Sequence, residues 1–173
     1  MNKTELAVIG GGPGGYVAAF KAADLGMDVT LIDLEAKPGG VCLYRGCIPS
    51  KALLHVARLL SEAREAESWG IKFAPPQIDL EQLNAWKERV IGKMTGGLGG
   101  LAKGRNVRLV QGSARFLDAR TLRIQMAQGG QEDLSFEHAI LATGSRPATI
   151  PSLALDSPRV LDSTGALALQ DIP

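Results

Sequence analysis

The sequence predicts an α/β fold with a parallel sheet, long helices and a small antiparallel β meander. A short apolar strand at residues 6–9 is followed by a glycine turn, a helical pattern and a second apolar strand at residues 29–32. A strand-helix-strand unit with fully buried strands is typical of a parallel sheet. After residue 107, short apolar segments separated by turn residues indicate the meander.

Size and composition are those of an ordinary globular domain. The chain has 173 residues, of which 45% are hydrophobic and 21% charged, and its net charge is +1. This length can bury a substantial core. The near-neutral charge gives no reason to expect nucleic acid or a membrane as a partner. We see no signal peptide and no run of membrane-spanning length, so we expect a cytoplasmic protein.

Three helices are expected in the first hundred residues. The first covers residues 13–25, because Pro13 suits a first helical turn and Gly26 suits a left-handed cap. The second covers residues 49–69. A third helical pattern begins at residue 80 and runs into a glycine-rich stretch, residues 96–100, where we expect the helix to weaken or bend.

The second half of the chain is expected to form short strands. Gly129-Gly130 marks a turn among them, and a last buried strand is followed by Thr143-Gly144-Ser145. The tail beyond residue 147 is expected to be irregular until a short helix after Ser163. The predicted strands are residues 107–110, 114–117, 122–126, 134–136 and 139–142.

The glycine turn after the first strand indicates a phosphate-binding loop. Gly10, Gly12 and Gly15 satisfy the pattern G-x-G-x-x-G between a strand and a helix, as in Rossmann-like domains. In this motif the first glycine permits the tight turn, the second lets backbone approach a pyrophosphate, and the third allows close helix-strand packing. A glycine turn in an unrelated α/β domain is the alternative, and the motif alone does not distinguish FAD from NAD.

Asp33 ends the second strand, twenty-three positions after Gly10. Its carboxylate can accept hydrogen bonds from ribose hydroxyls and would repel a 2′-phosphate. The sequence therefore favours an adenosine diphosphate moiety with a free ribose.

The two cysteines, Cys42 and Cys47, form the second chemical signal. In a cytosolic protein such a close pair favours a redox, catalytic or metal-binding role over a structural disulfide. Zinc needs four ligands, and His55 and His138 are poorly placed to complete a set, so we expect no metal. Two buried structural cysteines are the remaining alternative.

A disulfide between these cysteines requires an irregular backbone. Residues five apart in a regular helix lie about 8–9 Å apart, whereas a disulfide joins Cα atoms about 4.4–6.8 Å apart. Gly46 supplies the freedom to bend. Cys47 stands just before Pro49, near the start of a predicted helix, and both a helix N-terminus and the charge of Lys51 favour a thiolate.

The segment around the cysteines resembles the redox motif of the dihydrolipoamide dehydrogenase family, which belongs to the pyridine-nucleotide disulfide oxidoreductases. Glutathione and mercuric reductases share the cysteines and glycines but usually differ in the flanking residues. Tyr44-Arg45 departs from the commoner Asn-Val. The resemblance covers essentially the whole chain, through residues 39–54, 95–98, 102–105 and 140–147.

The resemblance implies that the first dinucleotide site binds FAD. Cys42 matches the interchange thiol that reacts with the dithiol substrate, and Cys47 matches the thiol that lies against the flavin. Lys51 matches a lysine near the reactive edge of the flavin, and Ala114 a position whose backbone meets the adenine. The implied cofactor-binding residues are Gly10, Gly12, Pro13, Gly14, Asp33, Leu34, Gly39, Gly40, Val41, Cys42, Lys51, Ala114, Thr143, Gly144 and Ser145.

The implied reaction oxidises dihydrolipoyl groups to lipoyl groups and passes two electrons, through a Cys42–Cys47 disulfide and FAD, to NAD. The implied partners are a second copy in a homodimer and the lipoyl domains of 2-oxo acid dehydrogenase or glycine cleavage complexes. We expect residues 1–148 to form the FAD-binding domain and residues 149–173 to connect it to an NAD-binding domain outside the 173 residues.

The family's catalytic base is a histidine paired with a glutamate in a C-terminal interface domain. We expect neither His55 nor His138 to be that base, and we expect the 173 residues to be inactive alone. A flavin-binding module without turnover, and an interaction fragment whose helix at residues 80–101 needs a partner surface, are the alternatives.

Overall fold

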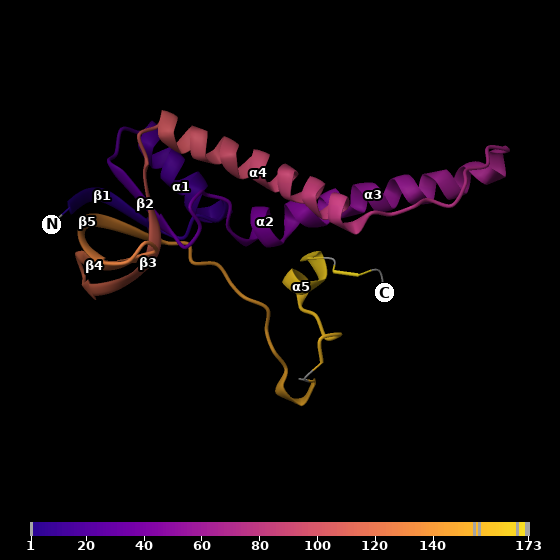
Figure 1. The fold of residues 1–173 in the computed structure, drawn as a ribbon. Coiled ribbons are helices and arrows are strands. Elements are labelled where there is room, and N and C mark those ends of the chain that lie inside the picture. Colours follow the sequence, from indigo (N-terminus) through magenta and orange to yellow (C-terminus); the bar gives the residue numbers. More distant parts are fainter. Residues whose placement is uncertain (1, 154, 156, 169, 172–173) are drawn as a thin grey trace. The chain divides into compact units, whose positions relative to one another are not determined.

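The computed structural model describes residues 2–153, 155, 157–168 and 170–171 (Figure 1). The chain divides into two compact units. The first unit comprises Met1–Cys42 and Met94–Arg146, and the second comprises Leu43–Lys93 and Pro147–Pro173. The predicted boundary at residue 148 concerns the domains of a longer protein, and it stays a prediction.

The first unit is built on a five-stranded mixed sheet. Strands β5, β1, β2 and β3 lie side by side in this order and run parallel. Strand β4 pairs antiparallel with both β3 and β5. The strands are β1 (Asn2–Ile9), β2 (Val29–Asp33), β3 (Arg108–Asp118), β4 (Thr121–Met126) and β5 (Gln131–Leu141). The predicted α/β class, with a parallel sheet and an antiparallel meander, is confirmed.

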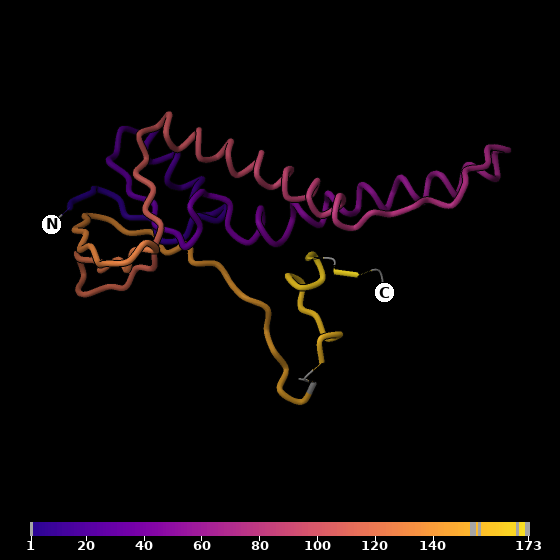
Figure 2. Tube along the Cα trace, in the orientation of Figure 1, coloured from indigo at the N-terminus to yellow at the C-terminus, as the bar shows by residue number. Residues whose placement is uncertain are grey.

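Two long strands join the parallel sheet to the meander and close the sheet into a ring (Figure 2). Residues 108–111 of β3 pair with β2, whereas residues 112–118 pair with β4. Strand β5 pairs with β4 through residues 131–135 and with β1 through residues 134–141. The predicted breaks at residues 111–113 and 137–138 were therefore wrong, because both strands continue. Strand β3 changes partner at its predicted break, whereas β5 stays paired with β1 on both sides of its predicted break.

Apolar residues cover both faces of the parallel strands, as predicted. Leu6 and Val8 of β1 point into a cluster that includes Phe20 and Ala102 of the covering helices. Ala7 and Ile9 point to the other side, into a cluster enclosed by the meander. Alternate residues of one strand thus support two cores, which explains its uninterrupted apolar sequence.

Helix α1 (Pro13–Asp24) covers one face of the sheet, together with the part of α4 (Leu80–Gly104) that belongs to the first unit, from Met94 onward. Gly26 follows α1 with φ +90°, so the predicted left-handed cap is confirmed. The predicted weakening of α4 at residues 96–100 was wrong, because the helix continues to Gly104. Packing outweighs the low helix propensity: Ala102 is fully buried, and side-chain atoms of Lys37 lie 3.7 Å from where a β-carbon at Gly99 would stand.

The second unit contains α3 (Cys47–Glu65), the 3₁₀ turns η1 (Ala66–Trp69) and η2 (Pro151–Leu153), and α5 (Ser163–Ala168). Helix α3 begins two residues before the predicted start, and the predicted last turn is 3₁₀ rather than α. Apart from η2, the described residues of the tail before α5 form no helix or strand, as predicted. The buried Lys87 of α4 donates hydrogen bonds to the Leu167 carbonyl over 2.7 Å and to the Asn84 amide oxygen over 2.9 Å.

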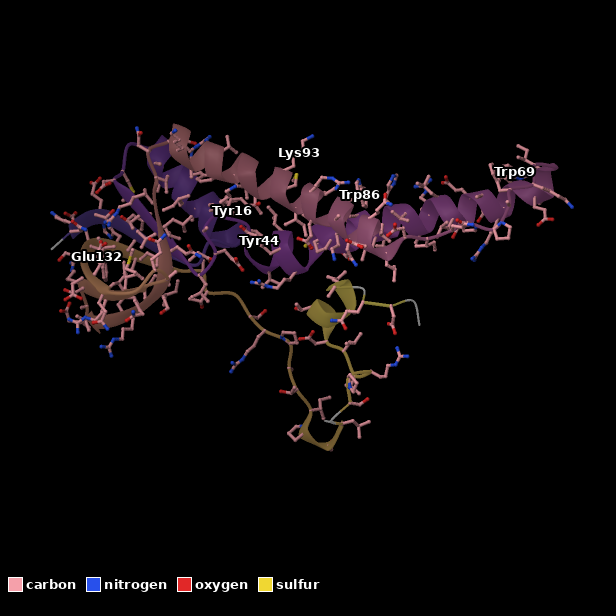
Figure 3. All side chains as sticks on the ribbon, viewed as in Figure 1. Tyr16, Tyr44, Trp69, Trp86, Lys93 and Glu132 are labelled. Carbon is pink, nitrogen blue, oxygen red and sulfur yellow. The ribbon has the colours of Figure 1, made fainter. Side chains whose placement is uncertain are left out.

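An ion-pair cluster ties together the amino ends of three strands in the first unit (Glu132 in Figure 3). Arg108 of β3 donates two hydrogen bonds to the Glu132 carboxylate of β5, over 2.7 and 2.9 Å, and Asn2 of β1 donates a third over 2.8 Å. The Asn2 hydrogen bond and the Arg108 guanidinium lower the pKa of Glu132, against an opposing effect of burial. None of the helices in the described residues has the length and apolar character needed to cross a membrane.

Candidate dinucleotide-binding turn and cysteine segment

The turn after β1 has the backbone geometry that its three glycines predict. Gly10 has φ +104°, and its N–H donates to the Ile32 carbonyl over 2.8 Å. A β-carbon at Gly10 would collide with the Ala142 carbonyl, and one at Gly15 would collide with the Gly10 carbonyl. The first glycine is therefore required because the backbone after β1 lies close to the backbone after β5. The third is required because helix α1 lies close to the backbone at the end of β1.

The second glycine of the motif stands at the start of helix α1. Gly12 is the N-cap residue, and its carbonyl accepts the first helical hydrogen bond from Tyr16 over 2.9 Å. Pro13 and Gly14 follow at exposed positions. The N–H groups of a helix's first turn have no partner within the helix, so they can donate to an anion such as a pyrophosphate.

Asp33 holds the turn in place from the end of β2. Its Oδ2 accepts a hydrogen bond from the Gly11 N–H over 2.5 Å, and its Oδ1 accepts one from the Glu35 N–H over 2.8 Å. Each carboxylate oxygen can accept more than one hydrogen bond, so this arrangement is compatible with the predicted ribose contact. The role of Asp33 in fixing Gly11 was not predicted. The signal was in the sequence, as a glycine between the motif glycines and an acidic residue at the end of the next strand.

The glycine pair before the cysteines is in direct contact with the predicted phosphate-binding turn. The Gly39 N–H donates to the Gly11 carbonyl over 2.8 Å. Gly40 has φ +58°, and a β-carbon there would lie 2.5 Å from the Gly12 Cα. Two segments 28 positions apart in the sequence are thus in backbone contact, which places Gly39 and Gly40 at the predicted diphosphate site.

The segment after β5 reaches the same turn. The Ala142 N–H donates to the Ile9 carbonyl over 2.8 Å, and the Thr143 backbone nitrogen would lie 3.1 Å from a β-carbon at Gly10. Thr143, Gly144 and Ser145 are exposed, and Gly144 has φ +72°. The structure therefore brings the start of this predicted contact segment to Gly10.

The remaining predicted residues of the first unit lie along the carboxyl ends of the parallel strands or on the cysteine segment. Leu34 is exposed after β2, and its carbonyl accepts a hydrogen bond from the Gln111 amide over 3.0 Å. Asp33 pairs with Gln111 in the sheet, and Ala114 follows three residues later on β3. Val41 is exposed. Ligands of open α/β sheets bind at this edge of the strands.

The cysteines lie in two successive helices, one short and one long. Cys42 is half-buried in α2 (Gly40–Arg45), a helix that was not predicted, and Cys47 is the exposed first residue of α3. Gly46 separates the helices with φ −145° and ψ −110°, which supplies the predicted irregularity. Both residues carry thiols in this structure, so their disulfide stays a prediction. Lys51 is exposed on α3, and its flavin contact also stays a prediction.

The two histidines are exposed in this structure. His55 lies on α3, whereas His138 lies within β5, paired with Leu6, and not before a strand as predicted.

The first unit therefore fits an adenosine diphosphate moiety. Glycine backbone lines the start of α1 where a side chain would fill the space, and the Asp33 carboxylate stands at the neighbouring strand end. Comparison with known proteins decides the family. The family model described as pyridine nucleotide-disulphide oxidoreductase matches residues 4–173.

The chain belongs to the pyridine nucleotide-disulphide oxidoreductase family. The predicted family is confirmed. Membership of this family implies FAD and NAD as cofactors, with FAD bound in the region that this chain matches.

Several curated relatives are named dihydrolipoyl dehydrogenase. The chain is 47% identical to that of Haemophilus influenzae over 171 residues, which cover 99% of this chain and 36% of the relative. It is 49% identical to dihydrolipoyl dehydrogenase 2 of Haloarcula marismortui over 172 residues, covering 98% and 36%. It is 47% identical to that of Geobacillus stearothermophilus over 171 residues, covering 99% and 36%. The chain thus spans about a third of the length of these relatives.

Proposed function

We propose that this chain is the FAD-binding, redox-cysteine part of a dihydrolipoyl dehydrogenase. The protein to which it belongs would oxidise dihydrolipoyl groups to lipoyl groups and reduce NAD. The observation that carries the proposal is the contact of Gly39-Gly40 with Gly11-Gly12, because it joins the segment leading to the cysteines to a diphosphate-binding turn. The relatives' names support the substrate.

The adenosine diphosphate half of FAD would be held by the first unit. The N–H groups at the start of α1 would donate to the pyrophosphate, and Asp33 would accept hydrogen bonds from the ribose. Backbone at Ala114 would meet the adenine, and Thr143–Ser145 would add contacts after β5. FAD, when bound, supplies the two-electron acceptor between the protein thiols and NAD.

The cysteines would carry out thiol–disulfide exchange. In the oxidised protein, a thiolate of the dithiol substrate attacks Cys42 of a Cys42–Cys47 disulfide, forming a mixed disulfide and releasing the Cys47 thiolate. The second substrate thiolate then displaces Cys42, and the substrate closes to its own disulfide. The substrate loses two electrons and two protons, while the protein disulfide gains the two electrons.

The wider assignment follows from the proposed reaction. The partners would be lipoyl domains of 2-oxo acid dehydrogenase or glycine cleavage complexes, together with a second copy of the chain in a homodimer. A cytoplasmic location suits two cysteines that exchange between thiol and disulfide. No nucleic acid or membrane partner is part of the proposal.

Single-cysteine variants test the proposed roles. The FAD-loaded protein should be yellow and should gain a long-wavelength absorbance band on two-electron reduction. Cys42→Ser should show this band without a reductant, because Cys47 would then be a permanent thiolate, whereas Cys47→Ser should never show it. Identical spectra for the two variants would refute the assigned roles.

A further inference from the structure

We infer that Gly40 is a positioning residue through which the occupancy of the diphosphate-binding turn controls the accessibility of Cys42. The inference rests on the proposed function, because it takes the start of α1 as the site of the diphosphate. It adds a coupling between that site and the thiol, with Gly40 as the element that transmits it.

The physical link is a backbone contact with no side chain between its partners. Gly40 is the first residue of α2, and Cys42 lies two residues further in the same helix. A β-carbon at Gly40 would lie 2.5 Å from the Gly12 Cα and 3.1 Å from the Gly12 nitrogen. Gly39 adds the hydrogen bond to the Gly11 carbonyl. Helix α2 therefore starts on the residues that shape the turn.

This contact makes two equilibria depend on each other. Cys42 is half-buried, so a reagent in solution reaches its sulfur when α2 moves locally away from the turn. That movement also removes the contacts of Gly39 with Gly11 and of Gly40 with Gly12, and the less constrained turn binds a diphosphate less well. A nucleoside diphosphate should therefore favour the state in which α2 contacts the turn, and it should slow modification of Cys42. Conversely, blocking Cys42 should weaken nucleotide binding.

ADP is the probe, because it carries the diphosphate and ribose without the flavin. The Cys47→Ser protein leaves Cys42 as the only thiol of the chain. The rate at which Cys42 reacts with the aromatic disulfide dithiobis(nitrobenzoate) is measured with and without saturating ADP. In this reaction the Cys42 thiolate attacks the reagent's S–S bond, forms a mixed disulfide and releases one coloured thiolate. ADP affinity is measured separately by calorimetry.

The expected result is a rate at least about 3-fold lower with ADP, and at most about 100-fold lower at 100 times the dissociation constant. In Gly40→Ala, ADP at a concentration that saturates this variant should slow the reaction less than about 1.5-fold. The added β-carbon would collide with Gly12 and so prevent the contact. Gly130→Ala is the matched control: Gly130 also has a left-handed φ, +83°, but apart from its chain neighbours no other described residue has an atom within 4 Å of its β-carbon position. That variant should keep the full effect of ADP.

A second measurement does not depend on Gly40→Ala folding. The Cys47→Ser protein labelled at Cys42 should bind ADP at least about 3-fold more weakly than the unlabelled protein. Binding of ADP without any change in the Cys42 rate would overturn the inference and leave the proposed flavin site intact, as would a full ADP effect in a folded Gly40→Ala protein. If the folded protein bound no ADP at all, the proposed flavin site would itself be wrong, and the inference would fail with it.

Discussion

The Gly11 N–H donates a hydrogen bond to Oδ2 of Asp33 over 2.5 Å, across 22 positions of sequence. The Glu35 N–H donates to the other carboxylate oxygen over 2.8 Å. Asp33 therefore ties the glycine turn to the end of β2, at the edge of the sheet where we propose that the dinucleotide binds.

Asp33→Asn should weaken FAD binding. An asparagine offers one acceptor and one donor, so one of the two backbone N–H groups would face an NH₂ group. Loss of a hydrogen bond to a charged group costs about 1.5–3 kcal/mol, which corresponds to a dissociation constant raised by about 10-fold or more. Quenching of flavin fluorescence during titration of the protein with FAD measures this dissociation constant.

Asp118→Asn is the matched control, since Asp118 accepts one backbone hydrogen bond, from Arg120 over 2.7 Å, in the turn after β3. It should bind FAD as the wild type does. Equal affinity of the Asp33→Asn protein and the wild type would show that the carboxylate does not organise the site.

Two adjacent glycines of α1 should respond oppositely to alanine. A β-carbon at Gly15 would collide with the Gly10 carbonyl, whereas the nearest atom to one at Gly14 is the Ala142 side chain at 4.0 Å. Gly15→Ala should lower the free energy of unfolding by about 3 kcal/mol or more. Gly14→Ala should leave it unchanged or raise it by up to about 1 kcal/mol, because alanine is the better helix former. Urea unfolding measures both, and similar destabilisation of the two would contradict the packing described.

Glu132 should make stability depend on acid pH. Its pKa in the folded protein lies below the usual 4.5, chiefly because Asn2 donates a hydrogen bond to the carboxylate. Burial opposes this shift, whereas the hydrogen bond and positive charge of Arg108 add to it. The folded state therefore binds fewer protons than the unfolded state near that pH. The resulting stabilisation is present above the unfolded pKa and is lost as the pH falls through the folded pKa.

Urea midpoints measured from about pH 6 to about pH 3 should thus fall more steeply for the wild type than for Glu132→Gln. Glu81→Gln, at an exposed position in the first turn of α4, should keep the wild-type slope. If the urea midpoint of Glu132→Gln fell with pH as steeply as that of the wild type, the Glu132 carboxylate would not contribute to the acid dependence of stability.

Lys87→Met should release α5. The buried Lys87 ammonium donates to the Leu167 carbonyl in the last turn of α5, where a positive charge also favours the helix dipole. Losing a hydrogen bond from a charged donor costs about 1.5–3 kcal/mol, so amide exchange over residues 163–168 should quicken by about 10-fold or more. Lys93→Met, at an exposed position of the same helix, is the control and should leave this exchange unchanged (Figure 3).

Local sequence patterns were sufficient to predict the glycine turn, the strand ending at Asp33 and the left-handed cap at Gly26. Each of these depends on residues that lie close together in the chain. The patterns were insufficient where distant segments decide the structure. Glycines led us to expect α4 to weaken or bend at residues 96–100, but burial of Ala102 and the proximity of Lys37 to Gly99 favour a continuous helix.

The candidate site divides in the same way. The motif predicted Gly10, Gly12 and Gly15 by spacing. The contact between Gly40 and Gly12 joins residues 28 positions apart and has no local signature in the sequence. Helix α2 was missed because its six residues, beginning with glycine, are too few to show a helical period. The long strand β3 was predicted as two strands, residues 107–110 and 114–117, whereas it continues through Gly112, which permits close approach to Gln125.

Titration of the purified protein with FAD tests most directly whether the glycine turn and Asp33 form a flavin site. The result we expect is saturable binding of one FAD per chain, displaced by ADP and weakened in Asp33→Asn. A protein that is folded by circular dichroism but binds no FAD, or binds it with an affinity that neither ADP nor the Asp33 substitution alters, would contradict this assignment.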